Sequence, residues 1–542
     1  MNAYETYYPR PLMKRDSFFS LCGTWKLNGS YVEVPFPVES DLSGYKGNTD
    51  KLEYIKEFIL PDNFYHGSDK VILHFGAIDQ KCEVYLNNNL ITKHEGGYLP
   101  FSININDYLE PVNTLKVIVE DNLDYFYPYG KQAKKPSGMW YTPVSGIWAP
   151  VWIESYDLIG IDNIDIHTDM DTLNIHIDSN SRKFRIEFEG YKKDFFTNDI
   201  SIKIDNPHLW SIDDPYLYTL KISTNHDVIE SYFALRKVEV KQVGQYKRIF
   251  LNNEPIFLNG LLDQGYYEDG LFIPKDPACY ETEIKNIKEL GFNTLRKHIK
   301  VELEAYYYYC DKYGILLIQD MVNSGKYHFF KDSLLPTIGF SKMKCKIKDQ
   351  ERYDFFIEHS IQTIKHLKSH PCIIGYTIYN EGWGQQGASL AYDTLKQIDP
   401  DRLFDSTSGW FFDDHSDFDS YHIYFRNKTL QANGKILLLS ECGGFKRTIE
   451  GHTSKKGSSW GYGKASSEKT LTDKILKMYR NMYLTSIENG LCGAIMTQVS
   501  DIEGEINGLF TYDRQVCKVD KQKLIEANQL IEETYKKYLK TA

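Results

Sequence analysis

The chain has 542 residues, of which 42% are hydrophobic and 25% charged, and its formal net charge is -11. Because a typical domain has about 100 to 200 residues, we expect two or three domains. The acidic balance lacks the basic surface that a phosphate backbone requires, which disfavours nucleic acid as a partner. No run reaches the roughly 18 apolar residues of a membrane span, and no secretory signal is visible, so we expect a soluble cytoplasmic protein.

The nine cysteines are scattered and include no Cys-x-x-Cys pair. An odd number without close spacing favours free thiols in a reducing compartment over disulfides or a zinc site. The sequence also contains no dedicated cluster of oxygen ligands for a hard metal ion. We therefore expect no cofactor and no dedicated metal site, and the sequence leaves open whether a metal ion assists.

Residues 1–155 consist of short segments of alternating polarity, such as KVILHFG and NTLKVIVEDN, and residues 156–244 contain similar segments, such as LNIHID and LYTLKIST. Alternating runs divided by Gly, Asn, Asp and Pro indicate two antiparallel β-sandwiches. Near the end of the first, Trp140, Trp148 and Trp152 lie close together in the sequence. They fit either the edge of a sheet or the rim of a sugar-binding site.

Residues 245–542 alternate buried strands with helices, which is typical of a parallel α/β fold. The first helix is predicted between Asp276 and Gly291, and others over 351–368, 468–488 and 520–539. We count eight strand candidates, at 255–262, 293–298, 314–320, 373–380, 402–407, 418–424, 435–441 and 492–498. Eight is the number that closes a TIM barrel.

Polar residues stand at the ends of these strands, where TIM barrels have their active sites. Glu381 follows the fourth strand and Glu441 ends the seventh, so we expect the two carboxylates to face each other across the barrel. Glycoside hydrolysis needs such a pair, one carboxyl to protonate the leaving oxygen and one to meet the oxocarbenium ion. The other strand ends carry Asp263, Gln264, Arg296, His298, Asp320, His422, Tyr424 and Asp501. Any one of these is more often structural, but packing does not readily explain so many together.

The segment HPCIIGYTIYNEGWG (370–384) resembles the acid/base segment of glycoside hydrolase family 2, which contains β-galactosidases, β-glucuronidases and β-mannosidases. The segment SGIWAPVWIE resembles that family's jelly-roll sugar-binding sandwich, and residues 156–244 resemble its immunoglobulin-like domain. The resemblance therefore covers the whole chain. It implies a retaining exo-β-glycosidase that acts on a carbohydrate through a covalent glycosyl-enzyme.

The same resemblance assigns roles to individual residues. Asn380 is expected to bind a substrate hydroxyl, Glu381 to be the acid/base and Glu441, in LLLSEC, to be the nucleophile. The segment FNTLRKH resembles the family's Asn-x-x-Arg-x-x-His strand, which implies that Arg296 braces the nucleophile. In YHIYF, Tyr424 resembles the tyrosine that contacts it.

The identity of the sugar stays open. Asp263 and Gln264 occupy a region that binds the sugar in relatives, but the surrounding NGLLDQGYY departs from the usual pattern. Family β-glucuronidases carry an Asn-x-Lys segment near the eighth strand, whereas this chain has Glu505-Ile506-Asn507. The missing lysine favours a neutral hexoside, as for a β-galactosidase. A cation from elsewhere, such as Lys297, would instead permit a β-glucuronide or β-galacturonide.

Aromatic residues after two strands are candidates for walls of the sugar site. Trp383 and Trp410 follow the fourth and fifth strands, and Trp460 is a weaker candidate; packing explains each equally well. A catalytically silent carbohydrate-binding protein, a scaffold for protein contacts and an inverting glycosidase remain as alternatives. The sequence leaves the oligomeric state open, a homo-oligomer included.

Overall fold

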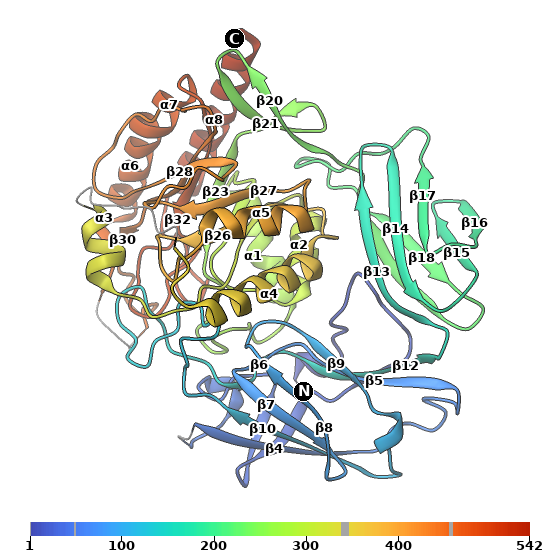
Figure 1. Ribbon diagram of the computed structural model, residues 1–542. Helices are drawn as coiled ribbons and strands as arrows, with labels where there is room; N and C mark the ends of the chain where they lie inside the picture. Colours follow the sequence, from blue (N-terminus) through green and yellow to red (C-terminus); the bar gives the residue numbers. More distant parts are fainter. Residues whose placement is uncertain (1, 48–49, 338–345, 455–458, 542) are drawn as a thin grey trace.

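The computed structural model describes residues 2–47, 50–337, 346–454 and 459–541 and has three domains along the chain (Figure 1). The first β-sandwich lies below the barrel in this view, and the second lies to its right. The predicted fold class, two sandwiches followed by a (β/α)8 barrel, is confirmed.

The first sandwich packs two antiparallel sheets face to face. In strand β10, Leu115, Val117 and Val119 are buried while the residues between them are less so, which gives the sheet one apolar face that packs against the other sheet. One sheet has the order β1 (Phe18–Ser20), β12 (Val151–Asp157), β5 (Asp69–Phe75) and β9 (Phe101–Asn104). The other has the order β3 (Ser30–Val34), β2 (Gly23–Leu27), β4 (Lys51–Phe58), β10 (Asn113–Glu120), β7 (Lys81–Leu86) and β8 (Asn89–Glu95). A small pair joins β6 (Ile78–Asp79) to β11 (Gly146–Ile147).

The second sandwich is smaller and immunoglobulin-like. Its core is aliphatic, with Ile177, Ile186 and Leu220 fully buried. One sheet contains β13 (Ile161–Thr168), β14 (Thr172–Ser179) and β17 (Asp199–Lys203), and the other β16 (Tyr191–Phe195), β15 (Phe184–Phe188), β18 (Tyr218–Ser223) and β19 (Val228–Phe233).

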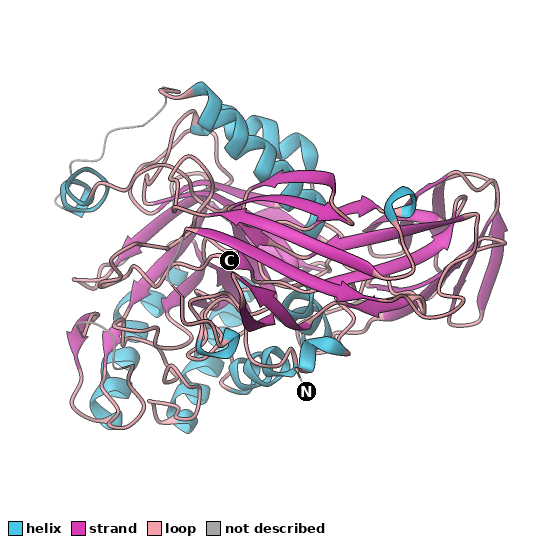
Figure 2. Ribbon diagram, turned by 90° about the horizontal axis from the view of Figure 1, so that it is seen from below, coloured by secondary structure: helices cyan, strands magenta, loops and turns pink. Residues whose placement is uncertain are grey.

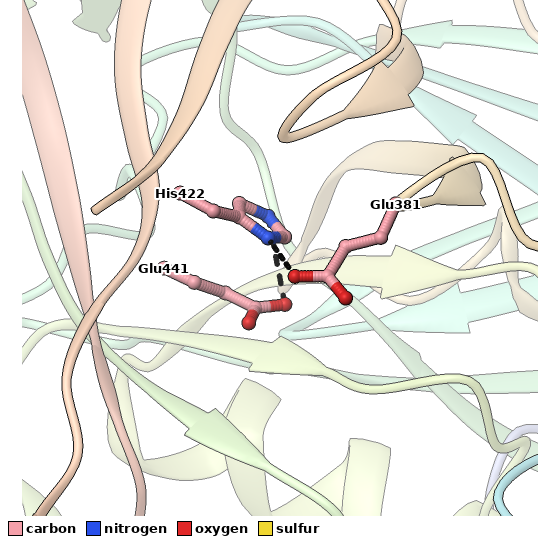
Figure 3. Close-up of side chains that lie close together, drawn as sticks. All are labelled: Glu381, His422 and Glu441. Atoms are coloured by element: carbon pink, nitrogen blue, oxygen red, sulfur yellow. Dashed lines mark hydrogen bonds and ion pairs between the residues drawn. The ribbon is translucent and has the colours of Figure 1, made fainter. Parts of the chain in front are cut away.

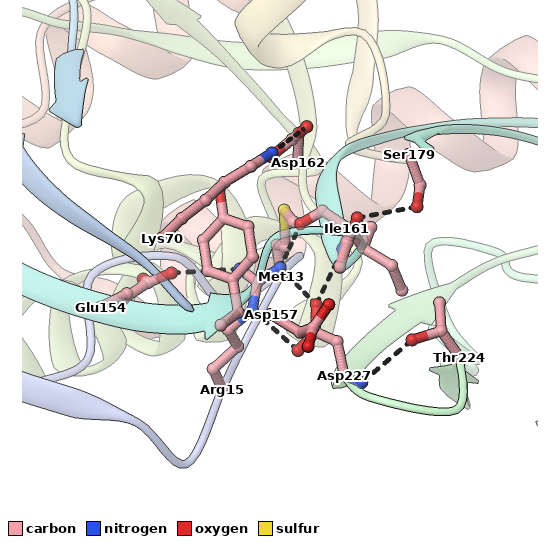
Figure 4. Close-up of polar contacts among 12 residues, drawn as sticks. Met13, Arg15, Lys70, Glu154, Asp157, Ile161, Asp162, Ser179, Thr224 and Asp227 are labelled. Carbon is pink, nitrogen blue, oxygen red and sulfur yellow. Dashed lines mark hydrogen bonds and ion pairs between the residues drawn. The ribbon is translucent and has the colours of Figure 1, made fainter. Parts of the chain in front are cut away.

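Arg15 joins the N-terminal segment to both sandwiches (Figure 4). Its guanidinium lies 3.1 Å from Glu154 Oε2 on β12 and 3.0 Å from Asp227 Oδ2 between β18 and β19. It also stacks 4.1 Å above the ring of Tyr156. Burial alone would raise the pKa of Glu154, but Arg10, His74 and Arg15 together lower it to about 2. The two sandwiches therefore share a buried ion-pair network.

Replacing Arg15 by Met is expected to lower the free energy of unfolding at pH 7 by about 3–5 kcal/mol, because the buried Asp227 loses its cation and Glu154 keeps only Arg10, 3.7 Å away. Urea unfolding followed by circular dichroism measures the change. Since the pKa of Glu154 is lowered, its stabilising contribution is complete above the ordinary glutamate value and is lost as the pH falls towards 2. The difference between wild type and variant should therefore shrink over that range.

Arg185→Met is the control, because Arg185 pairs with Asp194 at the surface with 42% of its side chain exposed. Its urea midpoint should stay close to that of the wild type. Equal urea midpoints for Arg15→Met and the wild type at pH 7 would show that the ion-pair network does not contribute measurably to the free energy of unfolding.

All eight predicted barrel strands are present and parallel. They form one sheet in the order β27 (Leu403–Ser408), β26 (Ile373–Asn380), β25 (Leu316–Asp320), β24 (Thr294–Lys297), β23 (Leu258–Asp263), β32 (Leu491–Thr497), β29 (Ile436–Gly443) and β28 (Phe418–Ile423). A short parallel pair, β30 (Phe445–Lys446) and β31 (Tyr462–Lys464), follows the seventh strand. Because the strands are parallel, their carboxyl ends meet at one end of the barrel.

The helices gather on the barrel side of the molecule, whereas the far end consists of strands and loops (Figure 2). The longer ones are α1 (Ala278–Glu289), α2 (Glu304–Tyr313), α4 (Gln350–Leu367), α5 (Ala388–Ile398), α6 (Glu468–Met478) and α8 (Lys521–Thr541). The predicted helix over 468–488 is divided, because a π-helical segment over Tyr479–Leu484 separates α6 from α7 (Thr485–Ile487). A second π-helical segment, Phe330–Leu334, precedes α3 (Leu335–Thr337).

A hairpin of β20 (Val238–Val243) and β21 (Tyr246–Leu251), extended by β22 (Glu254–Pro255), leads into the barrel. Ile249 and Leu251 pack in one apolar cluster with Leu258 and Leu316 of the barrel. The predicted boundary at residues 244 and 245 falls in the turn of this hairpin.

The cysteines that the structure describes are all free thiols, as predicted, and Cys345 lies outside the described residues. Among the described helices, none has the length and apolar character needed to cross a membrane.

Candidate active site

Glu381 and Glu441 approach each other at the carboxyl end of the barrel (Figure 3). Glu381 directly follows β26 in a left-handed conformation with φ 51°, which is uncommon for a residue with a side chain. Its amide donates to the carbonyl of Ser408 at 2.9 Å. At Gly382 a Cβ atom would stand 2.2 Å from the ring of Phe411, so only glycine fits after the turn.

The carboxylates and the ring of His422 form one compact group. One oxygen of each glutamate and one ring nitrogen all lie within 4.8 Å of one another. His422 Nδ1 is 2.7 Å from Glu381 Oε1, and its Nε2 is 3.5 Å from Glu441 Oε1. Retaining glycosidases hold their carboxyl groups about 5 Å apart, whereas inverting enzymes need at least about 6.5 Å. The observed spacing fits the retaining geometry.

Arg296 connects the residues around Glu441. Its Nη1 donates to Glu441 Oε1 at 3.1 Å, its Nη2 to Asn380 Oδ1 at 2.8 Å and its Nε to Asp320 Oδ1 at 2.9 Å. The guanidinium is fully buried, so its planar fork fixes these three side chains in one arrangement.

Glu441 is held in its ionised form. Burial alone would raise its pKa, but the neighbouring His422 and Arg296 outweigh burial and hold the pKa below the ordinary glutamate range. The hydroxyl of Tyr424 donates to Glu441 Oε2 and lies 3.1 Å from Thr497 Oγ1. An ionised, hydrogen-bonded carboxylate is the state that a nucleophile requires.

Several buried polar atoms in this end of the barrel make no hydrogen bond within the described residues. Both ring nitrogens of His298 lack a hydrogen bond, and burial holds its pKa well below the ordinary value, so the ring is neutral. Asp320 Oδ2 lies 3.3 Å from His298 Nδ1 without forming a hydrogen bond, and Gln264 Oε1 also forms none. Since buried polar atoms are nearly always hydrogen-bonded, these atoms are suited to bind the hydroxyls of a sugar.

Asp263 does not face the carboxylate pair. Its Oδ2 lies 3.1 Å from Lys297 Nζ and accepts from Tyr306 of α2 at 2.7 Å. Lys297 is also 2.5 Å from Glu302. Both charges are thus neutralised in the layer between strands and helices, which corrects the expectation that Asp263 contacts the sugar and that Lys297 supplies a free cation.

The three tryptophans considered as walls differ in position. Trp383 is buried, and its Nε1 donates to Tyr129 Oη at 3.0 Å and to the carbonyl of Gly325 at 2.9 Å. Trp410 stands with its ring centre 6.0 Å from that of His422. Trp460 is 37% exposed and lies 6.2 Å from the ring of Tyr462.

Of the three N-terminal tryptophans, Trp140 packs edge-on against Trp383 at 4.8 Å. Trp148 is buried and donates to Gly97, and Trp152 stacks on His74, away from the carboxylates. Of these three tryptophans, only Trp140 is therefore placed where it could form the rim of a sugar-binding site. Asp501 is also engaged elsewhere, since it lies 2.6 Å from Lys518 Nζ.

A loop of the first sandwich, residues 121–145 between β10 and β11, reaches the same end of the barrel. Tyr141 of this loop donates to Glu505 Oε2 at 2.5 Å, and the amide of Thr142 donates to Glu503 Oε1 at 3.0 Å. Lys131 lies in the same loop. Neither this approach nor the stacking of Tyr462 on Tyr424, at 3.9 Å, was anticipated from the sequence, because no local pattern marks them.

Glu381, His422 and Glu441 together present two carboxylates and an imidazole, a donor set that a divalent cation could also bind. The expectation of a site without metal therefore stays a prediction.

Comparison with known families matches three consecutive models. Residues 31–144 match the "Glycosyl hydrolase 2 galactose-binding domain-like" family, residues 162–236 "Glycosyl hydrolases family 2", and residues 238–443 "Glycosyl hydrolases family 2, TIM barrel domain". The last range includes both glutamates. Each match covers part of one of the three structural domains.

Individual relatives are more distant. A β-glucuronidase of Streptococcus agalactiae is 23% identical over 65% of this chain, and a β-galactosidase of Thermoanaerobacterium thermosulfurigenes is 29% identical over 47%. The matched stretches span only 64% and 39% of these relatives. The β-glucuronidase of Bifidobacterium dentium, solved with coumarin-3-O-glucuronide, superposes with a TM-score of 0.77 at 18% identity, covering 96% of this chain and 98% of that one. By its three matching domains, the chain belongs to family 2 of the glycosyl hydrolases.

Proposed function

We propose that the chain is a retaining β-glycosidase that removes a terminal β-linked uronic acid, as a β-glucuronidase does. The observation that carries the retaining chemistry is the placement of Glu381 and Glu441, with carboxylate oxygens within 4.8 Å. The uronic acid is supported by the relatives, since a curated one and a solved one are both β-glucuronidases.

The reaction proceeds in two displacements. The Glu441 carboxylate attacks the anomeric carbon while Glu381 gives its proton to the departing oxygen, so the glycosidic bond breaks as an ester bond to Glu441 forms. Water then attacks the same carbon, and Glu381 accepts its proton. The ester bond breaks, and the sugar leaves with its configuration retained.

A neutral β-galactoside is the second candidate. Glu505 and Asn507 occupy the segment where the family's β-glucuronidases carry Asn-x-Lys. The side-chain amide of Asn507 donates a hydrogen bond to Glu505 Oε1 at 2.9 Å. The absence of a lysine from this segment favours a neutral hexoside, and a β-galactosidase is among the relatives.

A panel of p-nitrophenyl glycosides tests the proposal. The β-D-glucuronide, galacturonide, galactoside, glucoside and mannoside are assayed with wild type and with Glu441→Gln. We expect kcat/KM on the glucuronide to exceed that on the galactoside at least about 10-fold, which corresponds to about 1.4 kcal/mol of discrimination. Proton NMR should detect the β-anomer of the sugar first. Preference for the galactoside would favour the second candidate, and an α-anomer as first product would rule out the retaining mechanism.

A further inference from the structure

The loop over residues 121–145 is fixed firmly above the strand ends. The amide of Tyr129 donates to the carbonyl of Asn323 at 3.1 Å, and the amide of Tyr141 donates to the carbonyl of Lys131 at 3.0 Å. Between them, Gly130 adopts a left-handed conformation, and a Cβ atom there would stand 2.5 Å from Tyr98 Oη and 3.1 Å from the carbonyl of Ile299. The backbone of Lys131 thus lies directly beside the end of β24.

Lys131 differs from Lys297 and Lys518, two buried lysines of the barrel. Lys297 lies 2.5 Å from Glu302, and Lys518 lies 2.6 Å from Asp501. Lys131, by contrast, makes no ion pair within 4.0 Å to any residue that the structure describes, although it is only partly exposed. A partly buried ammonium without a counter-ion is suited to receive an anion.

The charge of Lys131 reaches the catalytic centre. Burial raises the pKa of Glu505, and among the groups that lower this pKa the charge of Lys131 has the largest effect. Burial is the main cause of the lowered pKa of His298, and the charge of Lys131 is the second. Lys131 also contributes to the lowered pKa of Glu441. The ammonium therefore lies within electrostatic range of residues on both sides of the position where a sugar would bind.

We propose that Lys131, supplied by the first sandwich, binds the carboxylate of the uronic acid substrate and so determines specificity for it. This inference rests on the proposed function. It accounts for the absence of the family's Asn-x-Lys segment, because the cation comes from another domain. The neighbouring Glu505 has both oxygens engaged, by Tyr141 and Asn507, so its own hydrogen bonds do not depend on Lys131.

Two iminosugar inhibitors that differ only in carrying a carboxylate or a hydroxymethyl group provide the test. In the wild type we expect the carboxylate inhibitor to bind more tightly. Lys131→Met should weaken the carboxylate inhibitor about 10- to 100-fold, the effect of losing one charged hydrogen bond, and should change the neutral inhibitor less than about 3-fold. Lys131→Arg should restore most of the preference. Lys135→Met, at an exposed lysine of the same loop, is the matched control and should leave both inhibition constants unchanged.

The outcomes separate the two proposals. A wild type without preference for the carboxylate inhibitor would overturn the uronide as substrate, and with it the role of Lys131. A wild-type preference that persists in Lys131→Met would overturn the role of Lys131 alone. Equal weakening of both inhibitors would also overturn it, because Lys131 would then act on the carboxylate pair and not on the substrate carboxylate.

Discussion

Replacing Glu441 by Gly is expected to lower kcat by roughly 10⁴- to 10⁶-fold, the range found when a covalent nucleophile is removed. Added azide should restore turnover of a dinitrophenyl glycoside, because the small anion takes the place of the lost carboxylate. Since azide then displaces the leaving group directly, the product should be the glycosyl azide of inverted, α configuration. Steady-state kinetics and proton NMR of the product measure both effects.

The control for this variant is Glu450→Gly, at an exposed glutamate of the loop that follows the same strand. Its kcat should stay close to that of the wild type without azide. Substantial turnover by Glu441→Gly in the absence of azide would show that another group attacks the anomeric carbon.

Replacing Glu381 by Ala should lower kcat/KM by roughly 10²- to 10⁴-fold on glycosides with poor leaving groups, because these need a proton in the transition state. A dinitrophenyl glycoside needs none, so its first step should stay fast and the glycosyl-enzyme should accumulate, visible as a burst of dinitrophenolate. Azide should then accelerate release and yield the β-glycosyl azide, with configuration retained. Opposite azide products from the two variants would assign each glutamate its role.

Asp414→Ala, at an exposed carboxylate of the loop after β27, is the matched control. It should show neither the burst nor azide acceleration. An equal loss of activity on good and poor leaving groups in Glu381→Ala would argue against a proton-donating role.

The barrel and its central residues could be predicted because their signals are local. Each strand is a short apolar run, and the polar residue after it must stand at the carboxyl end of the barrel. This rule places Glu381, Arg296 and Tyr424 at the mouth of the barrel, and the family resemblance predicts that Arg296 and Tyr424 contact Glu441, as they do. The left-handed turn at Glu381 could not be predicted, because a glutamate seldom adopts it.

Asp263 and Lys297 show how the same rule fails. Successive side chains of a strand point to opposite faces, so Lys297 must face away from the interior that Arg296 occupies. Asp263 is its neighbour in register on β23 and faces the helices with it. Strand alternation, applied to Arg296 first, could have excluded both residues from the sugar site.

The position of Lys131 could not be predicted from the sequence for a different reason. The loop that contains it has no periodic pattern, and its position depends on hydrogen bonds to Asn323 and on the contact of Gly130 with Ile299. Asn323 lies 194 residues after Tyr129, and Ile299 lies 169 residues after Gly130. Such long-range contacts leave no local signal in a single sequence.

The hydrogen bond from Trp383 to Tyr129 joins a residue of the barrel, two positions after Glu381, to the loop of the first sandwich. This end of the barrel is therefore built from both domains. A recombination event that exchanged the first sandwich between relatives would also exchange one wall of the site, and a barrel that kept every catalytic residue could still change its substrate. In this architecture, new specificities can arise by exchanging a domain that contains neither Glu381 nor Glu441.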